Sequence, residues 1–309
     1  MHRKILAAVL ALAMLAGFAC PALAAGVRTV KDLPQPAGDS FAFLLSGDPQ
    51  IGASGNRARD IAGWTDSLTN ALAQWDDIAF LVAAGDQINT AGNTDELGGF
   101  LAPLEILDLV VAPTPGNHDK KAFLDNFDLP NRDGAGNYWY ACGDALFVHW
   151  NSDSGSKIIG DFLTQRKALL AAKAANPAAK WIIVVFHHSI YSAMSRATDF
   201  EVLLRRALFV PLFSRVGVNL VLMGHDHCYV RTKPIRYYFP CGRGTTYLTA
   251  NSGSGSKYYD LLDKTFRFEA AKGQVKAPTL SRVDVTPQAL TVTTCRTDTM
   301  EILDSFVVQ

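Results

Sequence analysis

Residues of metal-binding type stand at the ends of five apolar segments in this 309-residue sequence. In chain order, the candidates are Asp48, Asp86, Asn117, His187 and the pair His225 and His227. A Gly-Asp pair after a strand is usually an ordinary turn, so no single position decides the question. Two histidines separated by one residue in an extended chain, however, point to the same side, as a shared metal site requires. The ordered recurrence of these residues at segment ends therefore favours a functional site.

The donor set indicates which metals would bind. Two carboxylates, one amide oxygen and three imidazoles without a thiolate suit Zn, Mn or Fe(II) better than Cu(I) or an iron–sulfur cluster. Six ligands exceed the need of one tetrahedral ion, but they suit two ions that share a bridging carboxylate. Two ions about 3.5–4 Å apart form a clamp for phosphoryl hydrolysis. The sequence thus predicts two divalent transition-metal ions.

The apolar segments that precede these residues have the length of strands and alternate with helical patterns. Strands are predicted at 41–45, 78–84, 109–112, 181–186 and 219–223, and helices at 61–75, 97–107, 161–175 and 199–214. A hairpin is predicted at 138–151, further strands at 245–250, 281–285, 290–295 and 302–308, and a mobile Ser/Gly-rich loop at 251–257. We expect one α/β domain, with a mixed sheet or two facing sheets and helices outside, whose strand ends bring the candidate ligands together.

The first residues are typical of a secretion signal. A basic start at residues 2–4 precedes 14 uncharged, mostly apolar residues, 5–18, and Ala22-Leu23-Ala24 matches a cleavage pattern. Fourteen helical residues rise about 21 Å, less than the roughly 30 Å needed to cross a bilayer. We predict a signal peptide at 1–24, an exposed leader at 25–40, one folded domain at 41–309, no transmembrane segment, and a secreted, periplasmic or extracellular location.

Charge and cysteine content limit the partners. The chain has 29 basic and 29 acidic residues, so no nucleic-acid-binding surface is predicted. Export would place the four cysteines beyond the signal in an oxidising compartment, where disulfides form. Cys228 and Cys241 flank a loop-like segment that contains Pro234 and Pro240, and we expect them to pair.

Five ordered motifs resemble those of the calcineurin-like metallophosphoesterases, and most of all the catalytic domain of purple acid phosphatases. They are "GDPQ", "GDQIN", "PGNHD", "VVFHHSIYSA" and "GHDHCYVRT". The similarity runs from residue 41 to the C-terminus and includes the hairpin "GNYWYACGDALFVHWNSDS" and the closing strands "GTTYLTANSGSG" and "EILDSFVV". The resemblance implies a four-layer α/β/β/α sandwich (α/β, or α+β in some schemes) of two mixed sheets flanked by helices.

The resemblance also implies a role for each matching residue. Asp48, Asp86 and His227 would hold the first metal, and the second would be held by a bridging Asp86 with Asn117, His187 and His225. In this family a hydroxide held by both ions attacks phosphorus in line. The histidine at the position of His118 lies by the phosphate and leaving group, as a general acid or transition-state stabiliser. Further candidate substrate contacts are Asn117 and the three residues His188, Tyr191 and Asn151, although a tyrosine at such a position more often packs.

Two positions depart from the family pattern. Gln50 stands where the first motif usually has His or, in purple enzymes, Gly, and it is a doubtful extra ligand. Asn89 stands where purple enzymes carry the tyrosine whose phenolate binds ferric iron. We therefore expect a colourless enzyme that prefers divalent ions.

The leading hypothesis is an exported, acid-phosphatase-like hydrolase of phosphomonoesters. A phosphodiesterase on the same metal core is the alternative within the enzyme class. A non-catalytic relative that binds phosphate or a partner is the alternative from another class, motivated by Gln50. The sequence argues against this last alternative, because it retains every predicted ligand and His118, whereas a decayed site would have lost some of them.

Overall fold

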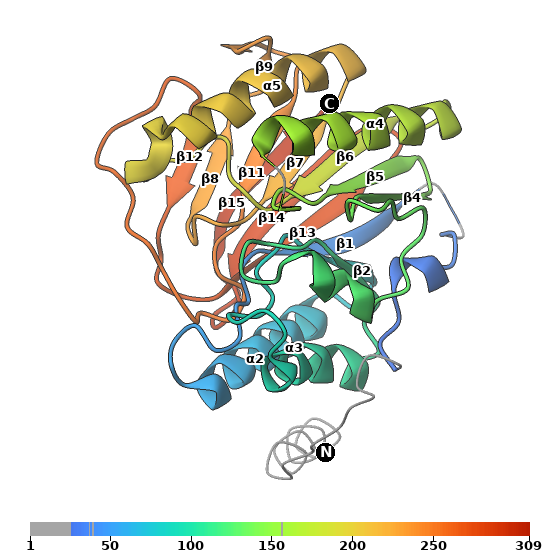
Figure 1. Ribbon diagram of the computed structural model, residues 1–309. Coiled ribbons are helices and arrows are strands. Elements are labelled where there is room, and N and C mark those ends of the chain that lie inside the picture. Colours follow the sequence, from blue (N-terminus) through green and yellow to red (C-terminus); the bar gives the residue numbers. More distant parts are fainter. Residues whose placement is uncertain (1–25, 37, 39, 156) are drawn as a thin grey trace.

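Two β-sheets pack face to face, and a pair of helices covers the outer face of each (Figure 1). The computed structural model describes residues 26–309 except 37, 39 and 156, so the predicted signal peptide lies outside the described residues. The arrangement is the four-layer α/β/β/α sandwich predicted above, and the fold class is confirmed.

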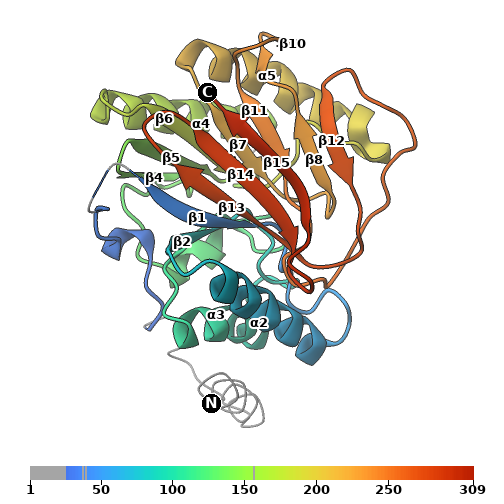
Figure 2. The same ribbon diagram turned by 180° about the vertical axis from the view of Figure 1, so that it is seen from behind.

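The first sheet has six strands in the order β15-β14-β13-β1-β2-β3. Its parallel part consists of β1 (Phe41–Ser46), β2 (Ile78–Ala83) and β3 (Val111–Pro113). Its antiparallel part consists of β13 (Thr279–Val285), β14 (Leu290–Arg296) and β15 (Ile302–Val308). The last strands of the chain therefore return to pair beside the first (Figure 2).

The second sheet has seven strands in the order β12-β8-β11-β7-β6-β5-β4. Four adjacent strands are parallel, namely β5 (Ala145–Trp150), β6 (Trp181–Phe186), β7 (Leu220–Met223) and β11 (Thr246–Thr249). Three are antiparallel to their neighbours, namely β4 (Tyr138–Cys142), β8 (Tyr229–Thr232) and β12 (Glu269–Gly273). A separate hairpin consists of β9 (Ile235–Arg236) and β10 (Phe239–Pro240).

Helices α2 (Arg57–Gln74) and α3 (Thr94–Ile106) lie on the first sheet, and α4 (Ile158–Ala175) and α5 (Phe200–Val216) lie on the second (Figure 1). Short 3-10 helices occur at η2 (Val30–Asp32), η3 (Lys121–Asn126) and η4 (Ser195–Thr198). Helix α2 begins earlier than its apolar pattern predicts, because Asn56 caps it by accepting a hydrogen bond from the Arg59 N–H. Within the described residues, none of the helices combines the length and apolarity that crossing a bilayer demands.

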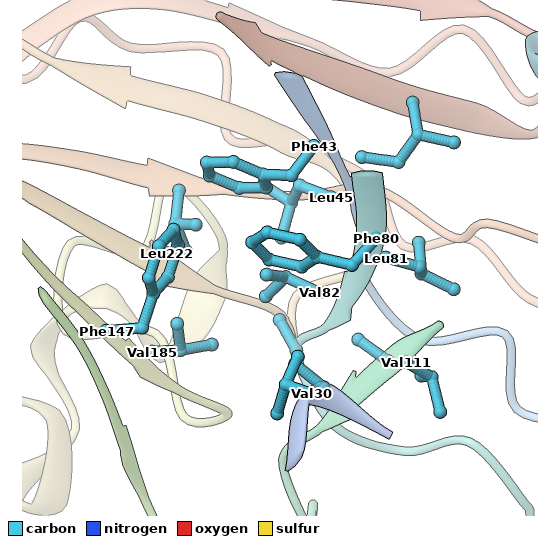
Figure 3. Packing of buried hydrophobic residues seen from close by; sticks show 14 of the residues in the cluster. Val30, Phe43, Leu45, Phe80, Leu81, Val82, Val111, Phe147, Val185 and Leu222 are labelled. Atoms are coloured by element: carbon cyan, nitrogen blue, oxygen red, sulfur yellow. The ribbon is translucent and has the colours of Figure 1, made fainter. Parts of the chain in front are cut away.

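Aromatic side chains fill the space between the sheets. Phe43 and Phe80 of the first sheet stack with centroids 5.3 Å apart, and Phe147 of β5 meets both edge-on (Figure 3). All three side chains are fully buried. Because helices cover the outer faces, the central strands are buried on both sides, which explains why they appear in the sequence as continuous apolar runs.

The Ser/Gly-rich segment 251–257 is not the mobile loop that its composition predicts. Residues 251–256 are buried. The Ser252 hydroxyl donates to the Asp48 carbonyl at 3.0 Å, and the Ser256 hydroxyl donates to the Pro49 carbonyl at 3.1 Å. Serine hydroxyls and glycines here let two backbones approach closely, which composition alone does not distinguish from flexibility.

The predicted Cys228–Cys241 disulfide is not formed, and this expectation is corrected. All four cysteines in the described part of the chain are free thiols. Cys228 is buried in a small apolar cluster with Met194 and Val230, whereas Cys241 is exposed in the turn after β10. The segment between them is an extended strand followed by a hairpin, which carries the two thiols apart.

The packing of α2 against α3 depends on Trp64, and this generates a prediction for stability. Its indole is fully buried, stacks on Phe100 and donates from Nε1 to the Phe100 carbonyl at 3.1 Å. Trp64→Ala should lower the free energy of unfolding by about 3–5 kcal/mol, because it leaves a cavity and removes the hydrogen bond of the indole. Denaturant unfolding would measure this. Ile159→Ala, at a 58% exposed position on α4, is the control and should change it by less than about 0.5 kcal/mol. A loss below 1 kcal/mol for Trp64→Ala would contradict this account.

Candidate metal centre and active site

Five strands from the two sheets place the predicted ligands at one edge of the sandwich. Asp48 follows β1 and Asp86 follows β2, while Asn117 lies in the loop after β3. His187 directly follows β6, and His225 and His227 follow β7. Because parallel strands of both sheets end at this edge, residues up to 179 positions apart in the sequence meet there.

The side chains form two groups that share one carboxylate. Asp48, Asp86 and His227 offer one ligand atom each within 4.8 Å of one another, and so do Asp86, His187 and His225. The family resemblance assigns the same residues to two metals, with Asn117 added to the second set, and Asp86 belongs to both groups. All are buried except His225, which is half-buried.

Ligand atoms of the second group lie at coordination spacing. His187 Nε2 is 3.1 Å from Asp86 Oδ2, 3.1 Å from Asn117 Oδ1 and 3.2 Å from His225 Nδ1. Atoms bound to one ion at about 2.0–2.2 Å lie about 3 Å from one another. In the first group His227 Nε2 is 3.4 Å from Asp48 Oδ1.

Backbone carbonyls orient two of the histidine rings. The Nδ1 of His187 lies 3.0 Å from the Ala84 carbonyl, and the Nδ1 of His227 lies 3.0 Å from the Lys257 carbonyl. A carbonyl only accepts, so each Nδ1 carries the hydrogen and each Nε2 is available to a metal. This is the usual second interaction of a metal-binding histidine.

Two glycines are required by the close approach of the loops. A Cβ on Gly116 would lie 2.1 Å from Asp86 Oδ1, and a Cβ on Gly224 would lie 2.6 Å from Asp48 Oδ2. The backbone at Asp48, Asp86, His225 and His227 has positive φ, between 43° and 74°. Such strained conformations concentrate at functional sites, where the surrounding structure enforces them.

The electrostatics of these buried groups follow from burial and from the attraction between Asp86 and His187. Burial raises the pKa of Asp48 well above its ordinary value. Burial also opposes ionisation of Asp86 and His187, but their mutual attraction outweighs it, lowering the pKa of Asp86 to about 2 and raising that of His187 to about 10. Burial lowers the pKa of His227 to about 3 and that of His225 well below 6.5.

The donors therefore form two groups that could each hold a metal ion. A buried Asp48 carboxylate that resists ionisation and a neutral His227 ring with a free Nε2 lone pair are what a cation would satisfy. Oxygen and nitrogen donors without sulfur suit Zn, Mn or Fe(II).

His118 is held beside the shared carboxylate without belonging to either ligand group. Its backbone N–H donates to Asp86 Oδ1 at 2.8 Å, and its Nδ1 lies 2.7 Å from the Asn89 carbonyl. Nδ1 thus carries a hydrogen, and Nε2 is the atom left for proton exchange. The ring is half-buried, so it is accessible from outside.

Gln50 and Asn89, the two departures from the family pattern, contact each other. Gln50 Nε2 donates to Asn89 Oδ1 at 3.2 Å. Gln50 is fully buried, and its Oε1 has no hydrogen-bond partner among the described residues. One buried amide oxygen thus remains free as an acceptor two residues after Asp48.

The weaker substrate-contact candidates separate in the structure. The half-buried His188 lies near the centre, with its ring centroid 4.6 Å from that of His225 and its Nδ1 2.8 Å from the Ser152 hydroxyl. Tyr191 does not reach the centre, because it is 3% exposed and packs between Tyr247 and Phe268.

The prediction for Asn151 is corrected as well. It is 1% exposed, and its side chain donates to the Ala135 carbonyl at 2.9 Å and accepts from the Asp153 N–H at 3.0 Å. Asn151 therefore shapes the loop after β5 and does not face a substrate.

Sequence reasoning missed two residues at the centre. Asp119 accepts from the backbone N–H groups of Gln87, Ile88 and Gly116, which ties the loops after β2 and β3 together. The position of Asp119 directly after His118 in "PGNHD" was the only indication in the sequence that it lies at the centre. Arg196 of η4 donates to His225 Nε2, and its place in an irregular segment gave no signal.

A sequence model of the family described as calcineurin-like phosphoesterase matches residues 41–229, a range that holds all of the predicted ligands. A search of curated proteins finds no match.

Solved structures share the fold. A purple acid phosphatase from yellow lupin (Lupinus luteus) seeds superposes with a TM-score of 0.70 at 16% identity, over 88% of this chain and 55% of its own. This chain thus spans about half the length of that protein. GAP50, the anchor in the inner membrane complex of Plasmodium, gives 0.63 at 12% identity over 87% and 89% of the two chains. PhoD gives 0.57 at 10% identity over 90% and 74%.

The coupled pair Asp86–His187 generates a prediction for the metal-free protein. At pH 8, below its pKa of about 10, His187 should be an imidazolium, while His225 and His227 should be neutral. Nitrogen–proton NMR correlations of the rings distinguish these forms. The folded-state pKa of His187 lies above the ordinary value of 6.5, so the folded state binds this proton more tightly than the unfolded state does. Proton binding therefore stabilises the metal-free fold. The stabilisation is complete below pH 6.5 and is lost as the pH rises toward 10.

Asp86→Asn tests the cause, because it removes the charge that holds the His187 proton; the ring should then be neutral at pH 8. His118→Ala is the control and should leave the three ring forms unchanged. Titration of all three rings together near pH 6.5 would contradict this electrostatic account.

Proposed function

The chain belongs to the calcineurin-like phosphoesterase family, and we propose that it is an exported, dinuclear metal-dependent hydrolase of phosphomonoesters, similar in action to an acid phosphatase. The observation that carries the proposal is the position of Asp86 in both ligand groups. One carboxylate shared between two buried sets of donors is the arrangement that two adjacent ions require.

In this proposal Asp48, Asp86 and His227 hold one ion, and Asp86, Asn117, His187 and His225 hold the other. The free amide oxygen of Gln50 is proposed as an additional donor to the first. Two such ions supply a strong nucleophile from water at neutral pH and neutralise charge on the phosphoryl oxygens. Asn89 offers no phenolate, so the protein should be colourless.

His118 is proposed as the proton donor to the leaving oxygen. The His118 Nδ1–H donates to the Asn89 carbonyl, so Nε2 is the ring atom that faces a substrate in this proposal. The hydrogen bond from the His118 backbone N–H to Asp86 Oδ1 keeps His118 beside the shared carboxylate. His188, held by Ser152, is proposed to line the same side as a substrate contact.

Export is proposed from the N-terminal pattern, namely the basic start, the short apolar run and the Ala22-Leu23-Ala24 site. The location would then be secreted or periplasmic.

A non-catalytic relative that binds phosphate or a partner is the second candidate. Two observations favour it, namely Gln50 in the first motif and the similar fold of GAP50, which is described as an anchor. The chain has both groups of candidate ligands that share Asp86, and it has His118, which supports the hydrolase over this alternative.

The direct test compares hydrolysis of p-nitrophenyl phosphate with that of bis(p-nitrophenyl) phosphate by the mature protein supplied with Mn, Zn or Fe(II). We expect faster release of p-nitrophenol from the monoester. Asp86→Ala should bind neither ion and should lose activity by at least about 10³-fold, because both sets lose a ligand. Faster hydrolysis of the diester would mean that the protein is a phosphodiesterase. Metal binding without hydrolysis of either ester would favour the non-catalytic relative.

His118→Ala separates proton donation from metal binding. Turnover should fall about 10²–10⁴-fold, the usual contribution of a general acid, while the metal content stays that of the wild type. Metal analysis and steady-state kinetics on the same sample measure both. Lys121→Ala, at a neighbouring exposed position, is the control and should alter neither quantity. Loss of metal from His118→Ala would mean that His118 is a ligand.

A further inference from the structure

The β9–β10 hairpin exposes aromatic side chains at its tip. Tyr237 is 45% exposed, Tyr238 is 47% exposed and Phe239 is 60% exposed, and the three are consecutive in the sequence. Strand β8 begins two residues after His227 and runs antiparallel to β11, so it leads the chain away from the metal centre to this hairpin. Figures 1 and 2 show β9 and β10 beyond α5, on the side of the molecule opposite α2 and α3.

The hairpin is fixed in place by the rest of the fold. Tyr237 and Tyr238 form its two-residue turn and both have positive φ, 45° and 74°, a conformation that usually takes Asn and Gly. The Tyr238 hydroxyl donates to the Ala207 carbonyl of α5 at 2.8 Å, and the Tyr237 N–H donates to the Ser214 hydroxyl at 2.9 Å. The Tyr238 side chain thus attaches the hairpin to α5, while the Tyr237 and Phe239 side chains remain exposed beside it.

Unpaired cations surround these rings. No Asp or Glu occurs between Asp226 and Asp260. Four exposed basic residues lie at or beside the hairpin and form no ion pair within the described residues; they are Lys233, Arg236, Arg243 and Arg267. Arg236 lies over the Tyr237 ring at 5.9 Å, and Arg267 lies over the Phe239 ring at 5.7 Å.

A hollow of about 240 Å³ adjoins the hairpin. Arg236 and Arg243 line it, together with Thr245, Asn219 and the C-terminal Gln309. Two guanidinium groups and, among the described residues, no acidic side chain line it, so it suits an anionic phosphate group.

We propose that this hairpin docks the protein on a lipid bilayer with anionic headgroups. Aromatic side chains that stand out on a tip enter the interface of a bilayer, and cations without carboxylate partners are attracted to its negative surface. Three consecutive side chains expose far less area than the roughly 800 Å² that each partner buries in a stable protein complex. The combination of projecting rings and unpaired cations favours a bilayer over a protein partner.

Vesicle sedimentation of the mature full chain tests the proposal. We expect binding to vesicles of phosphatidylcholine with phosphatidylglycerol, no binding to phosphatidylcholine alone, and weaker binding as salt is raised. Arg236→Gln with Arg243→Gln should lower the partition coefficient at least about tenfold, since each basic residue near the surface contributes about fivefold. Tyr237→Ser with Phe239→Ser should lower it by a similar factor.

Matched controls isolate the hairpin. Arg28→Gln with Lys31→Gln removes the same charge from positions that pair with Asp108 and Asp128, and it should bind vesicles as the wild type does. Phe200→Ser removes a 75% exposed aromatic side chain from α5 and should also bind normally. Circular dichroism verifies that each variant is folded, and the arginine pair remains informative if the aromatic pair does not fold.

Three outcomes would overturn the proposal. They are equal binding to neutral vesicles, undiminished binding by both hairpin variants, and no vesicle binding by the wild type. In the third case, retention of the wild type on dextran sulfate would assign the surface to a soluble polyanion.

Discussion

The Asp86 carboxylate joins the two halves of the molecule. It comes from the end of β2 in the first sheet, and its Oδ2 lies 3.1 Å from His187 Nε2, which comes from the end of β6 in the second. Its Oδ1 accepts a hydrogen bond from the His118 backbone N–H. A side chain at Gly116 would overlap with this oxygen, so the position requires glycine. Neither ligand group exists without it. The relative position of the two sheets, and hence the aromatic packing between them, must keep this contact in place.

The fold concentrates its unfavourable features at that contact. The buried Asp48 carboxylate, the buried His225 and His227 rings, the backbone with positive φ and the closely packed loops each destabilise the metal-free protein. The surrounding structure compensates through Asp119, which ties two loops by three backbone hydrogen bonds, and through the buried serines after β11. A bound cation would relieve the charge imbalance, so metal binding and stability should be coupled in this fold. The β9–β10 hairpin is strained in the same way but lies outside this network, where no ligand of the centre requires it.

Most strands and helices could be predicted because burial leaves a clear pattern. Strands β1, β2 and β6 are buried on both faces and appear as apolar runs, and α2 repeats its buried residues at helical spacing. The elements that were missed, β8, β12 and the β9–β10 hairpin, are short or partly exposed, so no run or alternation marks them. The Ser/Gly-rich segment after β11 was misread because its polar side chains bond to distant backbone, a tertiary effect that composition does not encode.

The sequence by itself determined the types of the candidate ligands, their order and their place at strand ends, because local hydrophobicity marks the strand ends and residue identity marks the candidates. Only the tertiary structure decided which candidates meet. Tyr191 and Asn151 follow strand ends as His187 does, yet one packs inside the second sheet's core and the other braces a loop, because side-chain direction depends on neighbours distant in sequence. The pairing of Gln50 with Asn89, the contact of Arg196 with His225 and the separation of Cys228 from Cys241 were decided in the same way, by the register and packing of two sheets.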